Sequence, residues 1–134
     1  MAEEGVQVGH GYHAAPGLDY RHRRHLVRLY QSGGKATIDI ASCSSGRISD
    51  LIGMLATSPA GEGERMAKVV VSGEVSLVAG GMIDIADPIT CNQSGRAVAA
   101  SSGDQVIAMA TSSCWADGEQ VRALIAFPAQ RLIY

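Results

Sequence analysis

The stretch that decides the fold is "RMAKVVVSGEVSLVAGGMIDIADPITCNQSGRAVAASSG", residues 65–103. Short runs of Val, Ile, Leu and Ala alternate in it with turn-forming Gly, Asp, Pro, Asn and Ser, and the pattern continues to residue 127. Short apolar segments at close, regular spacing are typical of β-strands joined by hairpins. The sequence therefore predicts a mainly β fold: a small β-barrel or β-sandwich built of short hairpins.

Strand boundaries inside this stretch follow from its turn residues. Gly73 separates "RMAKVVVSG" from "EVSLVAGG", so we expect two successive strands there. Pro88 has no backbone N–H and belongs at the start of a strand or at a sheet edge. Upstream, "HLVRLYQSGG" (residues 25–34) and "KATIDIAS" (residues 35–42) predict two more strands around a glycine turn.

The run "RISDLIGML", residues 47–55, has an ambiguous pattern. Its apolar residues have helical spacing, although Gly53 within the run and Pro59 after it weaken a helix. One helical turn and a bent strand both fit. We expect a short helix here, in a fold with at most one or two short helices. The apolar residues concerned are Ile48, Leu51, Ile52 and Leu55.

The chain divides by composition into an arm and a body. Its 134 residues suit one domain. A domain of this size buries roughly two thirds of its unfolded surface and needs no disulfide or metal to stabilise its core. Residues 1–25 are rich in Gly, Ala and His without apolar periodicity, and indicate an extended N-terminal arm. Residues 26–134 form the predicted β-rich domain.

Charge and cysteine content limit the partners. The net charge of −2 gives no global attraction to nucleic acid or to an anionic membrane, so we expect contact with neither. No apolar run is long enough to span a bilayer, and the first residues lack the apolar centre of a signal peptide. Cys43, Cys91 and Cys114 cannot all pair within one chain, which favours free thiols in a reducing cytoplasm.

Catalytic and metal-binding patterns are weak. His10 and His13, like His22 and His25, have the H-x-x-H spacing that zinc sites can use, and Cys43 could add a thiolate. Arginines surround the second pair, however, and there is no C-x-x-C. The chain after residue 25 contains no histidine to act as a base for a Ser or Cys nucleophile. We therefore expect no enzyme activity, no metal and no cofactor.

The N-terminal arm carries the candidate interface residues. Tyrosine and arginine are the residues most often found as interface anchors. The "RHRRH" cluster could contact nucleic acid, but attachment to an acidic protein surface fits at least as well. We expect the contacts to come from Tyr12, Tyr20, Arg21, Arg23 and Arg24.

Four segments in order resemble the capsid decoration, or head cement, proteins of tailed bacteriophages. They are "GMLATSPAGEGE", "VVVSGEVSLVAGG", "DPITCNQSGRAV" and "VIAMATSSCWADGEQVRALI", and the similarity covers about residues 53–125. Their order and spacing carry it, with glycines and one proline as fixed points. These are Gly53, Pro59, Gly61, Gly73, Gly80, Gly81, Gly95 and Gly118. Residues 1–20 have no counterpart, and Trp115 beside the closing turn is a departure.

The resemblance implies a structural protein of the virion, with a β-tulip-like form of the predicted barrel or sandwich. Such proteins bind the outer surface of an assembled icosahedral head as trimers, clamp neighbouring major capsid subunits against internal DNA pressure, and pair an arm with a strand of the shell. We accordingly expect a homotrimer, made in the cytoplasm of the bacterial host, with the major capsid protein as its partner. A phage fibre or spike base, or a carbohydrate-binding β-module, is the alternative.

Overall fold

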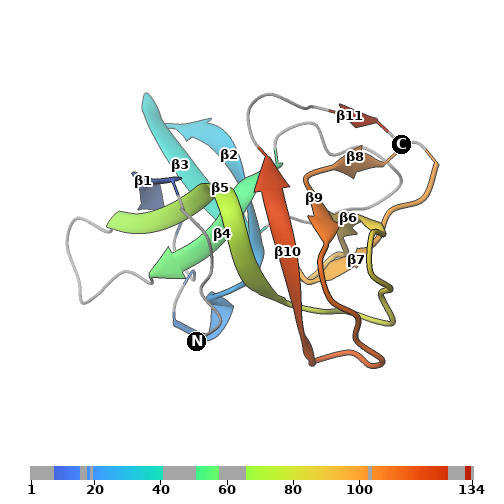
Figure 1. The fold of residues 1–134 in the computed structure, drawn as a ribbon. Helices are drawn as coiled ribbons and strands as arrows, with labels where there is room; N and C mark the ends of the chain where they lie inside the picture. The colour runs from blue at the N-terminus through green and yellow to red at the C-terminus, as the bar shows by residue number, and fades with distance from the viewer. Residues whose placement is uncertain are drawn as a thin grey trace.

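The computed structural model describes residues 8–15, 18, 20–40, 51–57, 66–102, 104–126 and 132–133. Within these residues the chain is nearly all β, as predicted, and the one helical element is the 3-10 helix η1 (Figure 1). The elements are β1 (Val8–Ala14), η1 (Tyr20–His22), β2 (Leu26–Ser32), β3 (Lys35–Ile40), β4 (Leu51–Thr57), β5 (Met66–Val78), β6 (Pro88–Cys91), β7 (Ala97–Ala99), β8 (Gln105–Val106), β9 (Ala108–Ala110), β10 (Gln120–Ala126) and β11 (Leu132–Ile133).

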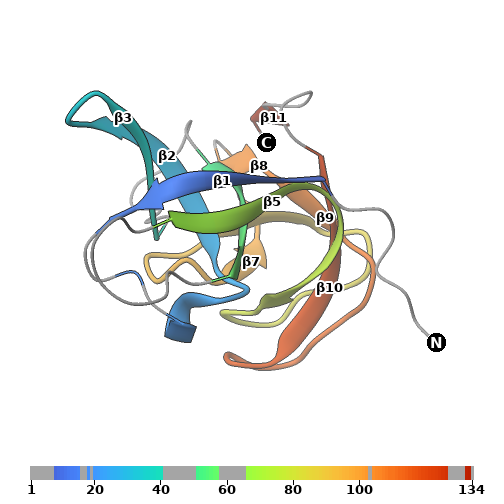
Figure 2. The same ribbon diagram turned by 90° about the vertical axis from the view of Figure 1, so that its left-hand side faces the viewer.

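Five strands close into a barrel. Their order is β1-β3-β2-β4-β5, and β1 pairs antiparallel with β5 to complete the ring. Figure 2 shows β1 and β5 lying side by side. The β1–β3 pairing is parallel and short, at His13–Thr37 and Ala14–Ile38. Closure leaves the barrel without an open edge along most of its wall.

Strand β5 connects the barrel to the rest of a nine-stranded sheet, and its second half together with β10, β9, β6 and β7 is called the second sheet below; β8 and β11 pair separately. The first half of β5 pairs with β1 and β4, and its second half, from Ser72 to Val78, pairs with β10. The sheet then continues β10-β9-β6-β7. The prediction of two strands on either side of Gly73 is therefore wrong. Gly73 has φ 119°, a value open to glycine, and lets one strand of 13 residues bend between the two sheets.

The predicted helix in residues 47–55 is also wrong where the structure describes it. Residues 51–57 form β4, while residues 47–50 lie outside the described residues. All five residues from Leu51 to Leu55 are buried, so an amphipathic helical pattern has no solvent face to match. A register shift between Leu55 and Thr57 bends the strand. Burial on both faces explains why the alternation expected of a half-buried strand is missing.

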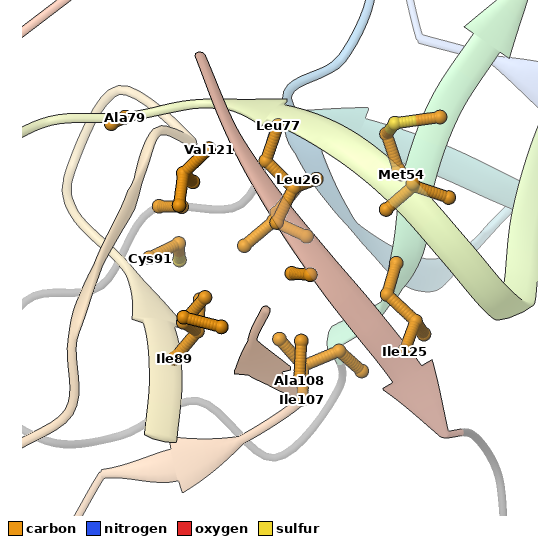
Figure 3. Close-up of a cluster of buried hydrophobic side chains, with 14 of the residues drawn as sticks. Leu26, Met54, Leu77, Ala79, Ile89, Cys91, Ile107, Ala108, Val121 and Ile125 are labelled. Carbon is orange, nitrogen blue, oxygen red and sulfur yellow. The ribbon is translucent and has the colours of Figure 1, made fainter. Parts of the chain in front are cut away.

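Two apolar clusters form the core. The smaller lies inside the barrel and includes Val27, Ile38, Ile52 and Val69. The larger fills the space between the barrel and the second sheet, where side chains from β2, β4, β5, β6 and β10 point toward one another (Figure 3). Its labelled members are Leu26, Met54, Leu77, Ala79, Ile89, Cys91, Ile107, Ala108, Val121 and Ile125.

Part of the segment expected to be an arm is a strand of the barrel. β1 pairs with β5 at six positions, and Ala15 bonds to the barrel through its N–H, which donates to the carbonyl of Ile38 at 2.9 Å. The side chain of Leu18 is 1% exposed in the smaller core cluster. β2 begins at Leu26, within the strand predicted for residues 25–34, and the sheet includes residues on both sides of the boundary expected after residue 25.

The remaining sequence predictions for this region have mixed outcomes. β2, β3 and the start of β6 at Pro88 are confirmed. Cys114 is a free, buried thiol, whereas Cys91 is disulfide-bonded, so the expectation of free thiols is wrong for Cys91. Cys43 lies outside the described residues. None of the described helical residues forms a segment long and apolar enough to cross a membrane.

Candidate interaction surfaces

The five predicted interface residues do not form one surface. Tyr12 in β1 is half-buried and packs against the barrel core. Arg21 and Arg23 are exposed around η1. Tyr20 begins η1, and its side chain lies outside what the structure describes. Arg21 and Arg23 therefore keep the exposure that an interface role requires, whereas Tyr12 contributes to packing.

Arg24 holds the loop after η1 against the barrel. Its N–H donates to the carbonyl of Leu55 at 2.9 Å, and its carbonyl accepts from the N–H of Val78 at 3.0 Å. Its Nη1 donates to the carbonyl of Ser76 at 3.3 Å. Arg24 has φ 64°, in the left-handed region that few non-glycine residues occupy. These bonds give Arg24 a structural role within its own chain.

The segment around η1 forms one wall of a pocket of about 490 Å³. The opposite wall comes from the turn between β6 and β7, and the described residues that line the pocket are Arg21, His22, His25, Ser94 and Arg96. The N–H of Leu26 donates to the carbonyl of Gly95 at 2.8 Å and fixes the two walls relative to each other. His22 and His25, which the sequence placed in an extended N-terminal arm, thus lie in a basic pocket.

Burial and charge both act on His25. Its ring is 7% exposed, and Nδ1 lies 3.1 Å from the carbonyl of Arg23. Burial lowers the pKa of His25 below its ordinary value of 6.5, and the positive charge of Arg96 lowers it further, against the opposing effect of the Arg23 carbonyl. His25 is therefore neutral at pH 7, and its Nδ1 carries the hydrogen because a carbonyl can only accept.

A metal site is not assembled from the described residues. No group of three His, Cys, Asp or Glu side chains within them could hold an ion. His10 and His13 lie on β1, and the side chain of His10 lies outside what the structure describes. The rings of His22 and His25 meet edge-on, with centroids 6.0 Å apart. Within the described residues, the second H-x-x-H pair, His22 and His25, therefore has no third side chain with which to hold an ion.

Exposed apolar side chains gather on the second sheet and its loops. Met109 of β9 and Leu124 of β10 are directly paired, and each is at least half exposed. Ile83 and Cys114 pair in an isolated bridge and are buried, so their neighbours Met82 and Trp115 point outward. Trp115 is 76% exposed. The paired residues Met109 and Leu124 are called the apolar face below.

The backbone beneath Trp115 is fixed by a carboxylate. Glu119 Oε1 accepts from the N–H of Trp115 at 2.7 Å and from the N–H of Ala116 at 3.1 Å. A large exposed aromatic ring on an ordered turn loses little conformational entropy when a partner covers it. In the sequence, Trp115 stood out only as a departure from the resembled family. Its exposure depends on the pairing of Cys114 with Ile83, which joins the two loops.

The hairpin of β2 and β3 projects from the barrel (Figure 2). β4 pairs with β2 only from Leu26 to Arg28, and β1 pairs with β3 only at Thr37 and Ile38. Among the described residues, the far end of the hairpin therefore pairs only with itself. The guanidinium carbon of Arg28 lies 4.5 Å from the centroid of the Tyr30 ring. The far end of the hairpin offers open strand edges, and the Arg28–Tyr30 pair lies along β2 between the barrel and that end.

Comparisons with known proteins support the fold. No family model matches the chain, and no curated protein matches it. Among solved structures, the fold is similar to the N base of the head fibre protein gp8.5 of bacteriophage phi29. The TM-score is 0.62 at 19% sequence identity, over 90% of this chain and 95% of that one. The architecture described above is therefore shared with a β-module found in a phage head fibre.

Proposed function

We propose that the protein is a structural component of a tailed-phage head, attached to the outer surface of the capsid. The observation that carries this proposal is the fold shared with a head fibre base over nearly the whole of both chains. The order of the glycine turns, which resembles that of capsid decoration proteins, supports it independently. In this role the paired sheets act as a rigid plug, and the major capsid protein is the partner.

The apolar face suits an interface of this kind. A contact between proteins has an apolar centre with aromatic and Met side chains, enclosed by a polar rim. Met109 and Leu124 lie next to Glu74 and Arg122, whose side chains form an ion pair at 3.4 Å. An apolar pair with charged neighbours matches that arrangement. We propose that the face packs against the capsid or against a second copy in a homotrimer, without nucleic acid or membrane.

Multivalency makes a modest site sufficient. If three copies engage neighbouring positions on an icosahedral shell, the second and third contacts form at a high effective concentration. Arg21 and Arg23, both exposed, would add charge-dependent contacts that weaken as salt rises. The projecting β2–β3 hairpin offers open edges to which an extended segment of the partner could add a strand.

Co-sedimentation with capsids tests attachment. Purified protein is mixed with expanded shells of candidate major capsid proteins, and the bound fraction is measured after pelleting. We expect Met109→Ser combined with Leu124→Ser to reduce binding at least tenfold with an unchanged melting temperature. Met66→Ser, which changes an exposed Met at the start of β5, is the matched control and binds normally. If the protein binds no shell, the proposed attachment to the capsid is wrong. If the double variant binds like the wild type, the apolar face is not the contact.

The two forms of this role differ in their mechanical consequence. A decoration protein clamps neighbouring capsid subunits and raises the resistance of a full head to internal pressure. A fibre base only anchors a projecting fibre, and the phi29 likeness favours this second candidate. DNA release from heads on heating, followed with an intercalating dye, separates them. Decorated heads retain DNA to a higher temperature under the first role, and release it at the undecorated temperature under the second.

A further inference from the structure

The basic pocket has features that attachment to a capsid does not explain. Its two walls come from residues 21–25 and residues 94–96, which are far apart in the sequence and joined by the Leu26–Gly95 hydrogen bond. The second wall is further fixed by Asn92, whose Oδ1 accepts from the N–H groups of Ser94 and Arg96 at 2.9 and 3.0 Å. Both walls are therefore held in place before any ligand arrives.

The side chains that line the pocket are mostly basic. Two guanidinium groups, two imidazoles and one hydroxyl make up its described lining, and no carboxylate is among those residues. His25 directs Nδ1–H to the Arg23 carbonyl, so Nε2 of the neutral ring is an acceptor and becomes a donor only when the ring is protonated. An anionic group placed here would meet positive charge from two separate segments of the chain.

Arg96 already binds one carboxylate. Its Nη1 donates to Asp117 Oδ1 at 2.6 Å, in an ion pair whose side chains are 36% and 64% exposed. The Nε of Arg96 is buried without a hydrogen-bond partner among the described residues. The guanidinium therefore keeps donor capacity beyond the Asp117 contact, and the fork of a guanidinium matches the two oxygens of a carboxylate.

We propose that this pocket binds the carboxylate groups of an acidic ligand, with Arg96 as the principal contact and Arg21 and Ser94 as further donors. A volume of about 490 Å³ accepts a small di- or tricarboxylate or two adjacent acidic side chains of a protein. Asp117 competes with the ligand for Arg96 from outside the pocket. The pocket shares Arg21 with the proposed capsid contacts but no residue with the apolar face, and ligand binding to the free protein does not require capsid attachment.

Calorimetric titration with citrate at low, constant ionic strength tests the proposal. We expect saturable binding that Arg96→Gln weakens at least tenfold. Arg28→Gln removes the same charge from the β2–β3 hairpin, away from the pocket, and should bind citrate like the wild type. Equal loss in both variants would mean that citrate senses only net charge, and would overturn the site. Unchanged binding in Arg96→Gln would overturn it as well.

A second variant works in the opposite direction, so a folding defect cannot imitate it. Asp117→Asn removes the internal competitor, and we expect citrate to bind several-fold more tightly. Weaker or equal binding would contradict the role of Arg96. Hexaglutamate and inorganic phosphate are two further probes that distinguish the sources of the ligand. If hexaglutamate binds and citrate does not, the ligand is an acidic segment of a protein. Tighter binding of inorganic phosphate than of either carboxylate probe would refute carboxylate recognition.

Discussion

Gly53 of β4 lies so close to Val70 of β5 that a β-carbon at residue 53 would overlap the carbonyl oxygen of Val70. This carbonyl belongs to the backbone of β5 in the barrel wall, so it cannot move aside as the end of a flexible side chain would. We expect Gly53→Ala to lower the free energy of unfolding by roughly 3 kcal/mol or more, because β4 must separate from β5. Urea unfolding followed by circular dichroism measures the change.

Gly81 provides the matched control for this substitution. An added β-carbon there meets no atom within 4 Å, and its φ is not in the left-handed region. We expect Gly81→Ala to leave the unfolding free energy unchanged or slightly higher, by up to about 1 kcal/mol, because alanine restricts the unfolded chain. Similar destabilisation in both variants would show that the Gly53–Val70 approach does not limit packing.

The sequence predicted the strands whose neighbours are near in the chain. β2 and β3 alternate around Gly33 and Gly34, which both have positive φ in the turn. It failed where a distant partner decides the structure. "GHGYHA" of β1 has few apolar residues, and its strand conformation depends on pairing with β5 more than fifty positions away. Residues 51–55 fit a helix or a strand, and burial on both faces selected the strand.

The candidate sites depend even more on distant contacts. Arginine is a residue type common at interfaces, but the hydrogen bonds of Arg24 to Leu55, Ser76 and Val78 give it a structural role. Arg96 received no attention from the sequence, because a single arginine after an S-G turn is common. Its position in the pocket depends on the hydrogen bond between Leu26 and Gly95. Charge clusters along the chain therefore located one wall of the pocket and missed the other.

The N-terminal strand should be required for folding. Deleting residues 1–15 removes β1, together with the buried side chains of Ala14 and Ala15, and opens the edges of β3 and β5. We expect the truncated protein to lose cooperative thermal unfolding or to aggregate through the exposed edges. Deleting residues 1–7 leaves β1 complete and is the control. A cooperative transition within a few degrees of the wild type in the longer truncation would show that β1 is dispensable.

Arg24 should matter for stability, whereas its exposed neighbour should not. Arg24→Ala removes the bond to Ser76 while keeping the left-handed backbone, and we expect a loss of roughly 1–2 kcal/mol. Arg24→Gly should lose less, because glycine adopts positive φ without the roughly 1–2 kcal/mol cost that other residues pay. Arg23→Ala, at an exposed position, should change stability by less than about 0.5 kcal/mol. An equal loss in all three variants, measured by urea unfolding, would contradict this assignment.

The Cys114 thiol should react slowly in the folded protein. Burial raises its pKa above the ordinary value, against the opposing bond to Ile83, and Sγ lies 3.2 Å from the carbonyl of Gly81. The thiolate is the reactive form, so little of it is present at pH 8. We expect labelling by iodoacetamide at residue 114 to be at least tenfold faster in denaturant than in buffer, as measured by peptide mass spectrometry. Fast labelling in buffer would mean that the backbone hydrogen bonds between Ile83 and Cys114 break readily and expose the thiol.

His25 should make the protein less stable in mild acid. Burial, assisted by the charge of Arg96, keeps the pKa of His25 in the folded state below 6.5, the value expected of the unfolded chain. As the pH falls below 6.5, His25 becomes protonated in the unfolded chain while it stays neutral in the folded protein. Proton binding therefore stabilises the unfolded state relative to the folded state. The contribution of His25 is therefore complete above pH 6.5 and is lost progressively below it, toward the lower folded pKa.

Urea unfolding at pH 7.5 and pH 5.5 measures this dependence, in a range where most carboxylates stay ionised. We expect His25→Asn to reduce the difference between the two pH values, because the Asn amide can still donate to the Arg23 carbonyl but takes up no proton. His13→Gln changes a histidine of β1, outside the basic pocket, and should keep the difference. Citrate bound in the pocket should also reduce it, since a carboxylate beside the ring favours the imidazolium form. An identical pH dependence in wild type and His25→Asn would show that another group is responsible.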